Sequence, residues 1–171
     1  MSVQRSDLDD LFSACYEELR GLASRVRGAD ASATLNPTAL VNEAYLRLVR
    51  SRAFHVESEL HFKRIAARAM RQILVDSARR RSAEKRGGGA PLVTFDDRLG
   101  ADTSSSDDVL ALDHALAELT ELAPRQAQVV ELRFFGGMEV TETASLLGVS
   151  EATIARDWRA ARAWLSHALS A

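Results

Sequence analysis

The stretch TETASLLGVSEATIARDW, residues 141–158, constrains the fold more than any other part of the chain. A small residue, Ala144, suits the close approach of two helices, and Gly148 suits a turn that requires a positive φ. Val149 is placed to fill the angle between the helices, and Ser150 is a favourable N-cap for the second one. The stretch therefore predicts two helices around a sharp turn, a helix-turn-helix.

Apolar residues recur at helical spacing through most of the remaining chain. The helices predicted from this spacing cover residues 7–28, 35–49, 61–86, 109–123 and 124–135. Residues 54–62 fit either a loop or the start of a helix, and the one strand candidate, PLVTF at 91–95, is too short to carry a sheet. The pattern predicts an all-α fold.

Gly, Ser and Asp are concentrated in residues 87–108, which predicts a flexible linker between two small helical domains. We place the domains at residues 5–86 and 108–171 and the linker at 87–107. The net charge of −2 hides an asymmetry, because residues 1–86 carry +5 and residues 87–171 carry −7. This asymmetry indicates a nucleic-acid surface in the first half and an acidic linker and second domain.

The composition argues against several classes of protein. A single cysteine, Cys15, rules out an intramolecular disulfide, and no His/Cys cluster has the spacing of metal ligands. The sequence has no P-loop, no dinucleotide motif and no catalytic set, so we predict no metal, no cofactor, no small-molecule substrate and no enzymatic activity. It also has no run of 18 apolar residues and no apolar leader, which predicts a cytoplasmic protein without membrane contact.

The stretch LNPTALVNEAYLRLV, residues 35–49, predicts a helix that begins with Asn36 as its N-cap and a proline at the first helical position. Its main apolar stripe consists of Leu40, Val41, Ala44, Tyr45 and Leu48. Leu46 lies off that stripe, so the helix has a second apolar side. Glu43 and Arg47 have the order that favours an ion pair on the outer face.

Two segments carry side chains that suit nucleic acid. The outer face of the last helix shows Glu151, Ala152, Ala155, Arg156, Arg159 and Arg162. Because a recognition helix can enter the major groove, we predict that Arg156 and Arg159 contact bases or phosphates and that Arg162 contacts phosphate. The alternative is an ordinary helical hairpin with solvated arginines.

The helix predicted at 61–86 is basic, and its start combines rings with cations at His61, Phe62, Arg64 and Arg68. Such a cluster suits an unpaired base, and the basic residues beyond it suit phosphates. The alternative is a solvated basic helix face that binds no nucleic acid.

Three motifs in this order resemble the extracytoplasmic-function (ECF) subfamily of sigma-70 factors, which are two-domain bacterial transcription initiation subunits. LVNEAYLRL at 40–48 is similar to the family's polymerase-binding helix, and AMRQILVDSARRR at 69–81 is similar to its I-A-R-N-x-x-x-D-x-x-R-R-R segment. LLGVSEATIARDWRAARAWL at 146–165 is similar to its recognition region. The resemblance covers nearly the whole chain and is greatest to the branch that carries LNPT and RDW.

The resemblance implies an alternative sigma factor that binds promoter DNA and the β′ clamp helices and β flap of core RNA polymerase. The positions implied for polymerase binding are Leu40, Val41, Asn42, Glu43, Tyr45 and Leu46. Those implied for the −10 element, including a base flipped out near residues 54–62, are His61, Phe62, Arg64, Arg68, Arg71, Gln72, Arg79 and Arg80. Those implied for the −35 element are Glu151, Ala152, Thr153, Arg156, Arg159, Ala160 and Arg162.

The sequence departs from the family pattern at two places. Many relatives carry a basic residue where Ala155 and Asp157 stand, which predicts a different −35 preference. Relatives often carry acids where Thr38 and Ala39 stand. A phosphate on Thr38 would add ~1.5–2 negative charges at a helix N-terminus, so we predict Thr38 as a phosphorylation site for a Ser/Thr kinase. The alternative is a threonine at a helix start with no regulatory role.

Other routes of control and another function remain open. An anti-sigma factor or the level of expression could regulate the protein in place of a kinase. A stand-alone helix-turn-helix regulator is the alternative function. It accounts for residues 139–169 but leaves LVNEAYLRL and the basic first half unexplained.

Overall fold

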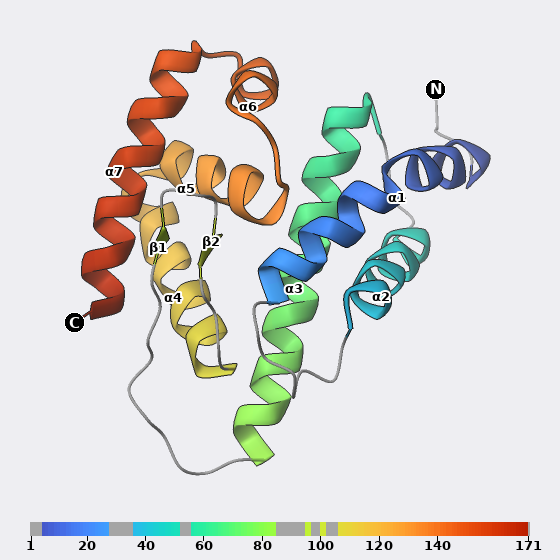
Figure 1. Cartoon of the computed structure of the whole chain (residues 1–171), viewed down its shortest axis with the longest axis horizontal. Helices are drawn as coiled ribbons and strands as arrows, with labels where there is room; N and C mark the ends of the chain where they lie inside the picture. Colours follow the sequence, from blue (N-terminus) through green and yellow to red (C-terminus); the bar gives the residue numbers. More distant parts are fainter. Residues whose placement is uncertain are drawn as a thin grey trace.

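The computed structural model describes residues 5–27, 36–51, 56–84, 95–96, 100–101 and 106–170. These residues are almost entirely helical, which confirms the predicted all-α class (Figure 1). The α-helices are α1 (Arg5–Arg27), α2 (Pro37–Arg50), α3 (Glu59–Glu84), α4 (Ser106–Leu122), α5 (Pro124–Val130), α6 (Val140–Leu147) and α7 (Glu151–Ser170). A π-helical turn, η1 (Glu131–Phe135), continues α5, and the strands β1 (Phe95–Asp96) and β2 (Gly100–Ala101) form one short antiparallel pair.

Several helix ends have the local chemistry that the sequence predicts. The Asn36 side chain accepts a hydrogen bond of 2.7 Å from the backbone N–H of Ala39, and so caps α2. Between α6 and α7, Gly148 has a φ of 65°, a left-handed conformation that suits glycine. Ser150 then accepts a hydrogen bond of 3.2 Å from the N–H of Thr153 at the start of α7. The turn between the last two helices therefore forms as predicted.

The helices pack on both sides of α3. Figure 1 shows α1 and α2 on one side of α3 and α4 to α7 on the other, and α3 contacts α1, α2, α4 and η1. Buried residues from both sides, including Leu40 of α2 and Leu116 of α4, belong to one hydrophobic cluster. The two predicted domains thus lie in direct contact, while their exact boundaries stay a prediction. Most of the predicted linker at 87–107 lies outside the described residues.

Two local predictions need correction. Arg47 pairs with Asp76 of α3 at 3.2 Å, not with Glu43 of its own helix, because α2 and α3 pack side by side. The predicted helix at 124–135 is also not uniform, because its last five residues take the wider π-helical form. For residues 54–62 the sequence fitted a loop or a helix start. In the described part, residues 56–58 are a loop and α3 begins at Glu59.

Candidate docking surface and nucleic-acid interface

The outer face of α2 is the first candidate surface. Asn42, Glu43 and Leu46 are exposed and lie within two turns of one another. Among the described residues, the large apolar side chains that are exposed are Leu46, at 42%, and Leu122 of α4, at 70%. With Asn42 and Glu43, Leu46 forms a small apolar centre with a polar rim, which is compatible with a protein contact.

The other residues predicted to contact polymerase are buried or half-buried. Leu40 and Val41 are fully buried, because they share the inward stripe of α2 with Ala44 and Leu48. Their predicted direct contact with polymerase therefore does not fit the structure. Tyr45 is half-buried, and its hydroxyl donates a hydrogen bond to Asp9 of α1. These residues hold α2 against the core, so only its outer face is accessible as a candidate docking surface.

Thr38 is the second residue of α2 and is half-buried. The first turn of this helix contains no acidic residue. A negative charge would be favourable there, because the free N–H groups and the helix dipole make the N-terminus electropositive. The first turn of α2 is therefore a place where an acidic residue would be favourable and where the chain has none.

Five of the predicted −10 residues of α3 lie on one face of that helix, which we call the strand face. It contains Arg64, Arg68, Arg71, Gln72 and Arg79. A cleft of about 430 Å³ lies along it, and α4, α5 and η1 supply the opposite wall with Asp113, Gln128 and Glu131. Arg79 and Arg80 also line a groove between α2 and α3. The structure thus gathers the predicted cations on α3, but the second half of the chain covers part of their face.

The start of α3 corrects the predicted ring-and-cation cluster. Phe62 is fully buried, so its ring is a core element and does not fit the predicted role in stacking on a base. His61 is half-buried, and its Nδ1 accepts a hydrogen bond of 3.1 Å from the N–H of Glu57. His61, Arg64 and Arg68 remain as the accessible part of the cluster.

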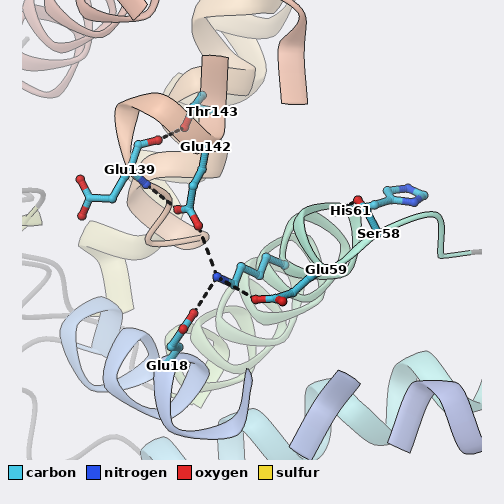
Figure 2. Close-up of polar contacts among 8 residues, drawn as sticks. Glu18, Ser58, Glu59, His61, Glu139, Glu142 and Thr143 are labelled. Carbon is cyan, nitrogen blue, oxygen red and sulfur yellow. Dashed lines mark hydrogen bonds and ion pairs between the residues drawn. The ribbon is translucent and has the colours of Figure 1, made fainter. Parts of the chain in front are cut away.

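Lys63 is a buried cation within the helix that the sequence predicts to be basic. Its side chain is only 10% exposed, and its Nζ lies 2.8 Å from Glu18, 3.5 Å from Glu59 and 3.4 Å from Glu142 (Figure 2). Burial alone would lower the pKa of the ammonium, but the ion pairs with Glu18 and Glu142 outweigh it and raise the pKa above its usual value. Lys63 therefore joins α1, α3 and α6.

The predicted recognition face of α7 is accessible. Glu151, Ala152, Arg156, Arg159 and Ala160 are exposed, and Thr153 and Arg162 are half-buried. The face lies opposite the buried residues Ile154, Trp158, Ala161 and Leu165. This arrangement leaves the arginines at the N-terminal end of α7 able to meet a DNA groove.

Asp157 explains one departure from the family pattern. Its carboxylate is buried and lies 2.6 Å from Nε of Arg125 in α5. Next to it, the guanidinium of Arg133 lies 4.7 Å from the ring centroid of Trp158, and burial lowers the pKa of Arg133. Asp157 therefore faces inward and fixes α7 to the rest of the fold, so its effect on the predicted −35 preference would be indirect.

Within the described ranges, no helix is long and apolar enough to cross a membrane. Within the same ranges, no group of three or more His, Cys, Asp and Glu side chains is arranged to hold a metal ion.

Comparison with known proteins agrees with the resemblance found in the sequence. The family model described as "ECF sigma factor" matches residues 4–171, which is nearly the whole chain. No curated protein and no solved structure matches the chain. The match includes α2, α3 and α7, the three helices that carry the candidate surfaces.

Proposed function

Because the chain belongs to the ECF sigma factor family, we propose that it directs core RNA polymerase to a specific set of promoters through three surfaces. The family is one of transcription initiation factors that bind core polymerase and promoter DNA. In our proposal, α2 docks on the β′ clamp helices, α3 holds the −10 element and α7 reads the −35 element. The second domain also meets the β flap. We assign no catalytic step to the chain, and its place of action is the cytoplasm, where its polymerase is.

The observation that carries the proposal is the exposed apolar position on α2. Leu46 is accessible one turn after Asn42 and Glu43, whereas the residues of the main apolar stripe, including Leu40 and Val41, are buried in the core. Size-exclusion chromatography with core polymerase tests this role. The wild-type protein is expected to co-elute, and Leu46→Asp is expected to elute separately.

Ala14→Asp is a matched control for this experiment, because it introduces the same charge at an exposed position of α1. It is expected to co-elute as the wild type does. Loss of binding in both variants would show a general effect of added negative charge. Co-elution of Leu46→Asp would contradict the assignment of the docking surface.

The promoter-binding role is tested by Arg159→Ala, since Arg159 is exposed on α7 and is not part of the core. This variant is expected to retain polymerase binding and lose promoter-specific transcription. A stand-alone helix-turn-helix regulator is the alternative function, and it predicts tight binding to palindromic duplex DNA without polymerase. Failure of the wild-type protein to co-elute with polymerase, together with such duplex binding, would favour the alternative.

We further propose that a Ser/Thr kinase phosphorylates Thr38 and strengthens polymerase binding. The support is the absence of acids in the first turn of α2, next to the docking surface. Thr38→Asp is expected to bind polymerase more tightly than Thr38→Ala, and equal affinities would refute the idea. Control by an anti-sigma factor would instead appear as co-purification of a protein that competes with polymerase. The assignment to the branch that carries LNPT and RDW stays a prediction.

A further inference from the structure

The cleft of about 430 Å³ along the strand face is lined by four arginines and three acids, and each of the acids already has an arginine partner. Nε and Nη2 of Arg71 donate hydrogen bonds of 3.1 and 2.9 Å to Oδ1 of Asp113, and Nη1 donates one of 2.8 Å to Oε2 of Glu131. Asp76 lies 3.2 Å from Nη2 of Arg47. The negative charges that line the cleft are therefore neutralised within the protein.

Arg64 and Arg68 are the cations of the cleft that have no such partner. Neither guanidinium forms an ion pair with a residue that the structure describes, whereas Arg79 lies 3.7 Å from Asp113. Arg64 and Arg68 are four positions apart on α3, so they are neighbours on one helix face, and like charges at this spacing are destabilising. An anion bound between the two guanidiniums would replace that repulsion with two charge-assisted contacts.

The rest of the cleft has apolar and amide groups. Val75 and Ala127 are buried and form its apolar part. Gln72 of α3 and Gln128 of α5 are exposed and add side-chain amides, which can pair with the edge of a nucleic-acid base through two hydrogen bonds. Small-molecule sites combine apolar walls with a few polar groups and have volumes of about 300–1,000 Å³, a range that includes this cleft.

The charge of the two free arginines matches that of a phosphomonoester. Such a group carries about 1.5–2 negative charges at neutral pH and has three acceptor oxygens, so it can bind two guanidiniums at once. An internal phosphate of a DNA strand carries a single negative charge. A terminal phosphate on a small molecule is therefore the better match for this pair of cations.

From these observations we propose that the cleft binds a small phosphomonoester that carries a flat ring, which is the chemistry of a nucleoside monophosphate. Arg64 and Arg68 hold the phosphate, and the apolar and amide groups contact the ring. This site goes beyond the proposed function, because binding requires neither polymerase nor promoter. The same two arginines belong to the predicted −10 set, so the small molecule and a DNA strand would compete for them.

Isothermal titration calorimetry of the full-length protein tests the site. The probes are adenosine monophosphate, adenosine and inorganic phosphate. We expect the monophosphate to bind at least about tenfold more tightly than either of the other two, because each of them keeps only part of the contacts.

The test variant is Arg64→Gln/Arg68→Gln, which removes both cations. It is expected to bind the monophosphate at least about tenfold more weakly, the size of one lost charge-assisted hydrogen bond. The matched control is Arg156→Gln/Arg159→Gln, which removes two neighbouring exposed arginines of α7 and is expected to bind as the wild type does. If the test variant fails to fold, Gln128→Trp replaces it, because a larger side chain on α5 fills the cleft and should also weaken binding.

Absence of monophosphate binding to the wild-type protein would overturn the site. Equal weakening in the test and control variants would also overturn it, because it would show a general attraction of anions to arginine. Fluorescence anisotropy with a labelled single-stranded DNA of 12 nucleotides distinguishes the two sources of phosphate. A strand that requires Arg64 and Arg68, in a protein that does not bind the monophosphate, would assign these cations to DNA alone.

Failure of the proposed function would be seen in a different experiment. A wild-type protein that does not co-elute with polymerase would count against the proposed function, whereas the calorimetry contains neither polymerase nor DNA. The two failures are therefore distinguishable.

Discussion

Replacing Gly148 by alanine tests the turn that places the recognition helix. Gly148 has a φ of 65°, and a Cβ built on it would meet nothing within 4 Å, so the substitution changes backbone strain and no contact. A side-chain-bearing L-residue in the left-handed region costs about 1–2 kcal/mol. Alanine also restricts the unfolded chain, which offsets about 0.4–1 kcal/mol. We therefore expect Gly148→Ala to lower the free energy of unfolding by about 1 kcal/mol.

Two further substitutions separate strain from other effects. Gly21 lies at an exposed position inside α1, also with nothing within 4 Å of a built Cβ, and its φ is not positive. Alanine is the better helix former, so Gly21→Ala should raise the free energy of unfolding by about 0.5–1 kcal/mol. Asparagine tolerates the left-handed region better than alanine, so Gly148→Asn should lose less stability than Gly148→Ala.

Urea denaturation followed by far-ultraviolet circular dichroism measures all three variants. The midpoints should shift in opposite directions for Gly148→Ala and Gly21→Ala, with the slope of free energy against urea unchanged. A midpoint for Gly148→Ala equal to or above that of the wild type would refute the left-handed turn. Equal losses for alanine and asparagine would show that backbone strain is not the cause.

Three other predictions concern the rest of the fold. Gly136→Ala should lower the urea midpoint more than any of these variants, because its Cβ would lie 2.4 Å from the carbonyl oxygen of Leu132. Asp157→Ala should lower the midpoint because the ion pair between the buried Asp157 carboxylate and Arg125 is lost. Arg156→Ala should leave the midpoint unchanged and weaken −35-dependent transcription, and the reverse pattern would contradict the places of the two residues on α7. Cys15 is 1% exposed and burial raises the pKa of its thiol, so native protein should resist iodoacetamide at neutral pH and react faster as the pH rises or the chain unfolds, which mass spectrometry would show.

The features that the sequence predicted well depend on residues close together in the chain. The cap at Asn36 requires only the three residues that follow it, and the turn at Gly148 requires only a residue that accepts a positive φ. Helical spacing also predicted the inward stripe of α2, including Leu40 and Val41. The resemblance alone assigned these two residues to polymerase binding, because a motif does not say which of its positions face outward.

The contacts between the halves could not be predicted from the sequence. Arg71 and Asp113 are 42 positions apart, and Lys63 and Glu142 are 79 positions apart. A basic helix with many acids elsewhere in the chain has many pairings of similar energy, and helix packing selects among them. Phe62 lies on the apolar face that helical spacing predicts for this helix, and its assignment to base stacking was wrong because the other helices cover that face completely.

Lys63 and Arg71 show that the cations of α3 do not have the same role. Glu18 and Glu59 of the first half account for two of the three ion pairs of Lys63, and only Glu142 comes from the second half. Both carboxylates paired with Arg71 come from the second half. Lys63 is therefore neutralised mainly within the first half, and a substitution of Lys63 should act mainly through the stability of the first half, whereas Arg71 joins α3 to the second half.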